Sequence, residues 1–481
     1  MHLIYDHRFC DVPRKIPKMQ VKEKFHLVRS EVNCSSSSHS SLGMNIYKVF
    51  YHFHNIEAEV NNMTMIEKVD QLTIDTISAI LNENWSQANA NEKEETAVIP
   101  KVNAVSVKKV EEGVLSDVYR VRLDYETDEI DGKKNEPPAN WLAKFCRSDL
   151  DLSWMCRNET IFYSKMAPRL VADASGLPFD IPKFLSGSDR HIILQEVTDI
   201  TTYPLTEGCP SEKIDFLLQS LAAWHAACWE SEVLSSQKVE ESLVFPTGMG
   251  QRLPPLQKEG LFVDSWKDTI DHMQLKDEEL LDFITKLCQK LATLKLRDIH
   301  DKVHNHRVTC VHGDFHIANW LFPKSGQGDE RKPVLVDFAT AGYGNPLVDL
   351  VFFMVVSTND AIVWDSQLFL ERYYNLLVQS EPTLSSKITL SALREWFPWA
   401  LLCQFMILVA YDGICRGIAQ AEQDQAKRES QLQHFRNVNR RMILALKGVE
   451  DWDSVLSKLE LTTPEEQKEA KEFCQTTPLV I

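Results

Sequence analysis

The segment Val311-His-Gly-Asp-Phe-His-Ile-Ala-Asn-Trp-Leu-Phe322 is followed, after a turn rich in Gly, Lys and Asp, by Val334-Leu-Val-Asp-Phe338. The apolar residues predict short strands, with a polar loop inside the first segment and a carboxylate at the end of the second. Phosphoryl transfer to a hydroxyl needs a carboxylate beside the nucleophile and oxygen ligands that hold magnesium against the phosphates. The pattern therefore predicts Asp314 as a catalytic base, with Asn319 and Asp337 as magnesium ligands.

The chain is strand-rich first and helix-rich second, which indicates an α+β fold. Residues 103–125 predict a hairpin turning at Glu111 to Asp117, and further strands are predicted at Trp141 to Cys146 and His191 to Val197. Helical periodicity dominates from Ile214 onward, with short strands at Val308 to Val311, Trp320 to Phe322 and Val334 to Phe338.

The first 64 residues show no sustained period and contain a serine run, so we expect a poorly ordered N-terminal extension. An amphipathic helix is predicted to open the folded part from Met65. We divide the chain into the extension 1–64, a strand-rich lobe 65–198, a helix-rich lobe 199–450 and a tail 451–481.

The pattern H-G-D-x-x-x-x-N, followed by a strand ending in D-F, resembles the catalytic and metal loops of the kinases that phosphorylate aminoglycosides, choline and ecdysteroids. Protein kinases instead carry H-R-D and D-F-G. The resemblance implies a two-lobed, protein-kinase-like fold with a small antiparallel-sheet lobe and a larger helical lobe. It also implies an enzyme that transfers the γ-phosphate of ATP to a small-molecule hydroxyl with the help of Mg²⁺.

The same resemblance assigns residues of the first lobe. Lys144, at the end of Trp141-Leu-Ala-Lys, matches the lysine that grips the phosphates, and Glu159 matches the helix glutamate that pairs with it. Such an ammonium neutralises the α and β phosphates, which is electrostatic work.

Other matched residues belong to the nucleotide site and to its support. Gly113 and Ser116 match the loop that covers the phosphates, and backbone groups around Glu196 and Val197 are expected to pair with adenine. In the second lobe, the resemblance implies a packed structural role for His225 and a bracing role for Asp349 beside the catalytic loop.

The formal net charge of −17 argues against nucleic acid and anionic membranes as partners, because both select positive surfaces. A cationic or neutral small-molecule acceptor fits the charge better. The apolar runs Leu347 to Val356 and Pro398 to Tyr411 are too short to span a bilayer, and the N-terminal residues lack the apolar core of a signal peptide.

The eleven cysteines are odd in number, scattered and never spaced C-x-x-C. They indicate neither a disulfide framework nor a zinc ribbon. We therefore expect a reducing, cytoplasmic location.

Other hypotheses remain open. The chain could be a catalytically silent nucleotide-binding or scaffold protein of the same fold. It could also be a protein kinase, although it lacks the H-R-D arginine, the D-F-G glycine and an A-P-E segment. A transition-metal site would use His300, His304, His306, His312 and His316. An aromatic cage for a cation would use Trp396, Phe397, Trp399, Tyr411 and Asp412.

Overall fold

The computed structural model describes residue 66 and residues 68–85, 101–112, 116–126, 138–146, 153–173, 176–231, 255–306, 308–324 and 331–476. The expected extension 1–64 and the loop glycine Gly113 lie outside these residues.

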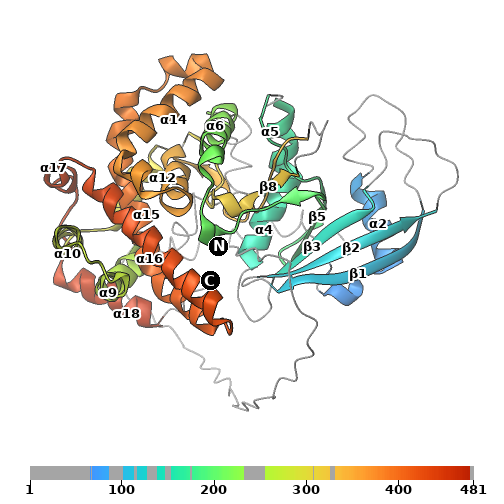
Figure 1. Cartoon of the computed structure of the whole chain (residues 1–481), viewed down its shortest axis with the longest axis horizontal. Coiled ribbons are helices and arrows are strands. Elements are labelled where there is room, and N and C mark those ends of the chain that lie inside the picture. The colour runs from blue at the N-terminus through green and yellow to red at the C-terminus, as the bar shows by residue number, and fades with distance from the viewer. Residues whose placement is uncertain are drawn as a thin grey trace, which may run out of the picture. The chain divides into compact units, whose positions relative to one another are not determined.

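The first part of the fold is a five-stranded antiparallel sheet in the order β1-β2-β3-β5-β4 (Figure 1). Its strands are β1 (Val102–Glu112), β2 (Ser116–Tyr125), β3 (Asn140–Cys146), β4 (Phe184–Gly187) and β5 (His191–Gln195). In β2, Val121 and Leu123 are buried and the alternating Arg120 and Arg122 are exposed, as the two-residue period of a strand requires. The predicted hairpin is confirmed, with Val107 of β1 opposite Val121 of β2.

One face of this sheet is covered by helix α2 (Ile74–Ile80), which buries Ile77 and Ile80. The helix begins after Thr73, whose hydroxyl accepts a hydrogen bond from the N–H of Thr76 at 3.2 Å. The prediction of a helix from Met65 is therefore wrong at its start. A separate 3₁₀ turn (Val69–Gln71) precedes the cap, and the π-helical turn Leu81–Trp85 follows the helix.

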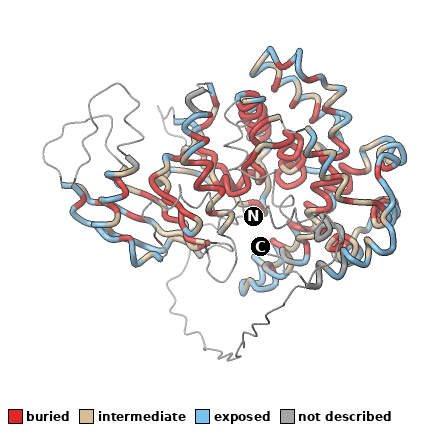
Figure 2. Tube along the Cα trace, turned by 180° about the vertical axis from the view of Figure 1, so that it is seen from behind, coloured by how far each residue is buried: buried red, intermediate tan, exposed pale blue. Residues whose placement is uncertain are grey.

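A helical segment joins β3 to β4 and belongs to a different core from the sheet. It consists of α4 (Ser153–Ile161), the π-helical turn Phe162–Met166 and α5 (Ala167–Asp173). Phe162 stacks on Phe338 with ring centroids 3.8 Å apart, which places it in the large hydrophobic core of the second part. The sheet and α2 form a smaller core around Trp141. Figure 2 shows the buried residues concentrated in the helical part.

The second part is mainly helical. Its helices are α6 (Ser211–Ala227), α9 (Pro255–Met273), α10 (Glu278–Leu291), α11 (Arg297–His304), α12 (Pro346–Ser357), α13 (Asp360–Trp364), α14 (Ser366–Ser380), α15 (Leu390–Ala421), α16 (Gln425–Lys447), α17 (Trp452–Leu456) and α18 (Pro464–Thr476). Three 3₁₀ turns, Leu205–Glu207, Ile317–Asn319 and Pro382–Ser386, lie among them. An antiparallel-sheet part followed by a larger helical part is the predicted α+β, two-lobed, protein-kinase-like fold.

Helix α15 is longer than its apolar sequence run predicted. By length and composition Leu390–Gly413 is sufficient to cross a membrane, and 61% of its most apolar window is buried inside the protein. This burial arises because α15 packs against α9, α12 and α16. The argument that the apolar runs are too short to span a bilayer therefore does not hold for this helix.

Short strands bring the two sequence segments of the predicted site together. β7 (Thr309–Val311) pairs with β10 (Gly342–Gly344), and β8 (Trp320–Pro323) pairs with β6 (Ile200–Thr201) and β9 (Val334–Leu335). The strand predicted at Val334 to Phe338 is therefore shorter than expected. The chain leaves the ladder before Asp337, whose backbone is left-handed with φ 66°.

Candidate active site

The loop His312-Gly313-Asp314 follows β7 and has a conformation that requires glycine at its centre. Gly313 has φ +79°, and a Cβ atom there would overlap the carbonyl oxygen of Thr340. His312 is buried, and its Nε2 lies 3.0 Å from the carbonyl oxygen of Val336, so this nitrogen carries the proton. Its Nδ1 then accepts the N–H of Asp314 at 3.3 Å. The histidine thus joins the loop to the segment that carries Asp337.

Asp349 supports this loop by accepting hydrogen bonds from its backbone. It lies in the first turns of α12, after the helix cap Asn345 and Pro346, and it is fully buried. Its carboxylate accepts the N–H of His312 at 2.7 Å and that of Gly313 at 2.8 Å. The bracing role expected from the resemblance is therefore seen in the contacts.

His225 of α6 supports Asp349 from the other side. Its Nε2 lies 3.2 Å from the Asp349 carboxylate, and its Nδ1 lies 2.7 Å from the hydroxyl of Tyr373. The carboxylate fixes the proton on Nε2, so the tyrosine donates to Nδ1. Burial raises the pKa of Tyr373 well above its ordinary value, which keeps this donor protonated. The buried His225 is a packing residue, as expected.

Asp314 is held with its carboxylate close to a buried histidine. The Asp314 side chain is 15% exposed, and its Oδ2 lies 3.4 Å from Nε2 of His316. Burial opposes ionisation of Asp314, whereas the contact with His316 favours the ionised carboxylate. His316 was not predicted as a partner of Asp314, although its position two residues later in the same loop was a usable signal.

Asn319 and Asp337 lie on neighbouring backbone segments. The N–H of Val336 donates to the carbonyl of Asn319 at 3.0 Å, next to the pairing of Trp320 with Leu335. The side-chain Nδ2 of Asn319 donates to the backbone carbonyl of Asp314 at 2.9 Å, which makes Oδ1 the atom that can bind a cation. An amide oxygen beside a carboxylate fits the donor preference of Mg²⁺. The left-handed backbone at Asp337 is the kind of strain that concentrates at functional sites.

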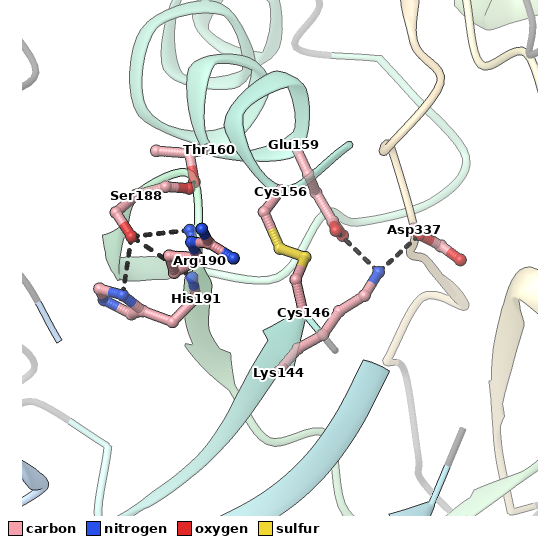
Figure 3. The surroundings of a disulfide bond; sticks show 9 residues. All are labelled: Lys144, Cys146, Cys156, Glu159, Thr160, Ser188, Arg190, His191 and Asp337. Atoms are coloured by element: carbon pink, nitrogen blue, oxygen red, sulfur yellow. Dashed lines mark hydrogen bonds and ion pairs between the residues drawn. A yellow bond between two sulfur atoms is a disulfide. The ribbon is translucent and has the colours of Figure 1, made fainter. Parts of the chain in front are cut away.

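Lys144 connects the sheet to the loop that carries Asp337. Its Nζ lies 2.8 Å from Oε2 of Glu159 on α4 and 3.0 Å from Oδ1 of Asp337 (Figure 3). Burial disfavours the ammonium, but the charges of Asp337 and Glu159 outweigh it and raise the pKa of Lys144. Burial and the charge of Asp337 raise the pKa of Glu159 to about 7, against the opposing effect of Lys144. One ammonium group therefore contacts two carboxyl groups, and all three side chains are largely buried.

Helix α4 is fixed to the same loop by a residue that the sequence did not single out. The side-chain Nδ2 of Asn158 donates to the carbonyls of Ala339 and Ala341, both at 2.9 Å. Asn158 is buried, so these bonds are not replaced easily by water. Its neighbour Glu159 was predicted instead, because Glu159 matches a charged position of the family.

One backbone group that was expected to bind the nucleotide base already forms a hydrogen bond within the sheet. The N–H of Glu196 is already bonded to the carbonyl of Asn140 at 3.1 Å, so it is not available to adenine. The Glu196 side chain accepts both Nε bonds of Arg120, at 2.7 and 2.9 Å. Ser116 is buried, and its hydroxyl has no hydrogen-bond partner among the described residues.

The sequence profile of the ecdysteroid kinase-like family matches residues 110–385, which is more than half of the chain. The chain belongs to the ecdysteroid kinase-like family. No curated protein matches the sequence at a significant level.

Similar solved structures include small-molecule kinases. A microcompartment-associated aminopropanol kinase is 14% identical, with TM-score 0.38, covering 74% of this chain and 94% of its own. A choline kinase from Cryptosporidium parvum Iowa II is 10% identical, with TM-score 0.39 and coverages of 76% and 94%. The ADP-bound aminoglycoside phosphotransferase APH(2'')-Ib is 16% identical, with TM-score 0.36 and coverages of 75% and 98%.

The described residues form neither the histidine metal site nor the aromatic cage that the sequence left open. Across the described ranges, no group of three or more His, Cys, Asp or Glu side chains is placed to hold a metal ion. Of the histidines proposed for such a site, His306 stacks on Trp396 with centroids 4.3 Å apart. Of the proposed cage, Phe397 and Trp399 are buried in the large core.

The acidic member of that cage, Asp412, is also engaged. Its carboxylate binds the side chains of Asn439 at 3.0 Å and Arg416 at 2.8 Å. The negative charge is therefore neutralised by an arginine of the same helix. The five residues therefore do not form the proposed cage, because Phe397 and Trp399 are in the core and Asp412 is paired with Arg416.

The cysteine pattern gave no indication of a disulfide, and the structure corrects this. Cys146 and Cys156 form a disulfide across 10 residues of sequence. The pairing follows from the packing of α4 beside the end of β3, which sequence spacing does not reveal. The described residues include six free cysteines, of which four are buried.

Proposed function

We propose that this chain transfers the γ-phosphate of ATP to a hydroxyl group of a small molecule. The observation that carries the proposal is the Lys144 ammonium, which lies 2.8 Å from Glu159 and 3.0 Å from Asp337. A single nucleotide must contact the sheet lysine and the metal-binding loop together. The ion pair between Lys144 and Asp337 brings the sheet lysine and the proposed metal-binding segment together, next to the loop that carries Asp314.

In the proposed site, Lys144 binds the α and β phosphates and Glu159 orients it. Ser116 contributes its buried hydroxyl near the phosphates, together with the loop glycine Gly113. The adenine contacts fall to the carbonyl of Glu196 and the N–H of Val197, because the Glu196 N–H is used within the sheet. These contacts position the nucleotide and neutralise its charge, which is the main protein contribution to phosphoryl transfer.

Asn319 and Asp337 are the proposed ligands of Mg²⁺. When bound, the ion supplies positive charge that neutralises the phosphate oxygens and fixes the geometry of the leaving group. Asn319 is oriented for this role by its bond to the Asp314 carbonyl. Lys144 restrains the Asp337 carboxylate through their ion pair.

Asp314 is the proposed base. Its carboxylate orients the acceptor hydroxyl and takes its proton as the phosphoryl group arrives. Its contact with His316 favours the ionised carboxylate, which is the form that can accept a proton. The acidic chain, with net charge −17, favours a cationic or neutral acceptor over an anionic one.

The test replaces Asp314 with asparagine, which keeps the shape and removes the charge. We expect the dissociation constant of a non-hydrolysable ATP analogue with Mg²⁺ to change by less than about threefold. Turnover should fall by roughly 10²-fold or more, as is typical when a general base is lost. Calorimetry measures the first quantity. ADP release with a panel of ecdysteroids, choline, ethanolamine, aminopropanol and aminoglycosides measures the second and identifies the acceptor.

The matched control is Asp282→Asn on the exposed side of α10, where neither quantity should change. Unchanged turnover in Asp314→Asn would reject the base assignment, and equal losses of binding and turnover would make Asp314 structural. Tight nucleotide binding without ADP release on any acceptor would favour the silent nucleotide-binding protein instead.

A further inference from the structure

The Cys146–Cys156 disulfide lies beside the ion pair that is central to the proposed site. Cys146 is the last residue of β3, two positions after Lys144, and Cys156 is on α4, three positions before Glu159. Figure 3 shows the disulfide and the ion pair as two neighbouring links between the same strand and the same helix. One link is covalent, and the other is the contact that holds the lysine for the phosphates.

The register of the sheet brings a third element to this point. Ser116, at the start of β2, lies opposite Cys146, and Val118 lies opposite Lys144. The end of β3 is also held by the bond from the N–H of Cys146 to the carbonyl of Arg190 at 2.9 Å. The strand side of the disulfide is therefore fixed, so the helix is the side that can move when the bond is broken.

The other contacts of α4 hold a different part of the helix. Asn158 bonds to the loop after Asp337, and the hydroxyl of Thr160 donates to the carbonyl of Ser188 at 2.9 Å. Both residues lie C-terminal to Cys156. The disulfide thus fixes an earlier turn of α4 against the strand, whereas these bonds fix the later part to other elements.

The two sulfur atoms differ in their surroundings. Cys156 is buried at 1% exposure, whereas Cys146 is only partly buried. We therefore expect an incoming thiolate to attack at Cys146, the more exposed residue of the pair. Access is one of the main determinants of the rate of thiol–disulfide exchange.

We propose that the Cys146–Cys156 disulfide is a thiol-sensitive latch that holds Glu159 against Lys144, so that its reduction weakens the nucleotide site. The inference rests on the proposed function, because it assigns a regulator to that site. The reductant is a dithiol. Its first thiolate bonds to the sulfur of Cys146, the disulfide breaks, and Cys156 leaves as a thiolate that takes a proton. The second thiol of the reductant then displaces Cys146 and closes the reductant's own disulfide. Two electrons pass to the protein.

Reduction is expected to release the first turns of α4 while Asn158 and Thr160 still hold the later turns. The Lys144–Glu159 contact then depends on a helix that is still held at Asn158 and Thr160 but is no longer joined to β3 one turn earlier, at Cys156. We expect the affinity for an ATP analogue with Mg²⁺ to fall at least about fivefold, the lower end of ordinary coupling between sites. Amide exchange in Ser153–Ile161 should become faster, and both effects should reverse on reoxidation.

The experiment compares the full chain before and after treatment with dithiothreitol. Alkylation and peptide mapping establish the state of Cys146 and Cys156, calorimetry measures analogue binding, and hydrogen exchange reports on α4. The double variant Cys146→Ser/Cys156→Ser should bind like the reduced protein and should not respond to dithiothreitol. Cys209→Ser, which removes a partly buried free thiol elsewhere, should keep the full response.

Each other outcome overturns the inference. Free thiols at Cys146 and Cys156 in the untreated protein would do so, as would a response to dithiothreitol that persists in the double variant. So would complete reduction with a binding change below about twofold, the scatter expected of independent sites. Equal binding in both forms leaves the proposed function intact, whereas no nucleotide binding in either form overturns the proposed function as well.

Discussion

Replacing Asp349 tests how the fold holds the catalytic loop. Its carboxylate accepts the N–H groups of His312 and Gly313 at 2.7 and 2.8 Å and faces Nε2 of His225 at 3.2 Å. Asp349→Ala leaves all of these donors buried and unpartnered, at about 1–3 kcal/mol each before relaxation. We therefore expect the free energy of unfolding to fall by about 3–5 kcal/mol, the range seen when one partner of a buried charged contact is removed.

The same substitution should affect turnover more than nucleotide binding. The loop bonded to Asp349 continues directly into Asp314, and a displacement of about 1 Å at a reacting group can cost on the order of 10²-fold in rate. Lys144 and Glu159 are held by other elements, so analogue affinity should change little. Urea unfolding followed by circular dichroism measures stability, and ADP release with the identified acceptor measures turnover.

Two further variants make the reasoning refutable. Asp349→Asn keeps one acceptor oxygen but turns an amide N–H₂ toward a buried N–H, so an intermediate loss of about 1–3 kcal/mol is expected. Asp424→Asn makes the same change at an exposed helix cap, where asparagine caps as well as aspartate and stability should stay within about 0.5 kcal/mol. If Asp349→Ala also stayed within that margin, the carboxylate would not support the loop.

Two more predictions concern stability. Gly313→Ala should cost about 2 kcal/mol or more, because a left-handed backbone alone costs about 1–2 kcal/mol and the new methyl meets the Thr340 carbonyl. Gly413→Ala in α15, where the methyl meets nothing, should be neutral or stabilising in the same urea titration. Burial lowers the pKa of His191 to about 4, so the unfolded chain takes up the proton first, and this contribution is complete above about pH 6.5 and is lost as pH falls toward 4. Its loss amounts to at most about 3 kcal/mol. His191→Gln should flatten the measured stability profile across that window, and a profile as steep as that of the original chain would contradict the assignment.

Much of the candidate site could be predicted because its residues lie in two short segments. The eight-residue span from His312 to Asn319 holds the loop, and its chemistry is local enough for spacing to indicate it. The alternation of Val121 and Leu123 with exposed residues likewise fixed one strand of the hairpin. Local patterns of this kind predict elements well because period and burial are coupled.

The missed features all depend on contacts between distant segments. The start of α2 was predicted too early because the helical spacing of apolar residues begins before Thr73. The capping hydrogen bond of Thr73 instead sets the first residue of the helix. Arg120 and Glu196 are 76 positions apart, and nothing in either neighbourhood indicates their pairing. The disulfide was missed because pairing depends on the distance in space between cysteines, and their spacing in the sequence matches no motif.

The geometry of α4 explains how one short helix can couple the sheet to the loop that carries Asp337. Successive residues of an α-helix are rotated by about 100°, so positions three and four apart share a face. Cys156, Glu159 and Thr160 therefore lie on one face, and their partners are all in the sheet or its turns. Asn158 and Phe162 lie on another face, and their partners are the carbonyls and the ring that follow Asp337. A rotation of the helix that releases the first face must also strain the second. The disulfide joins only the first face to the sheet, so breaking it is expected to change how α4 holds Lys144 relative to the loop that carries Asp337.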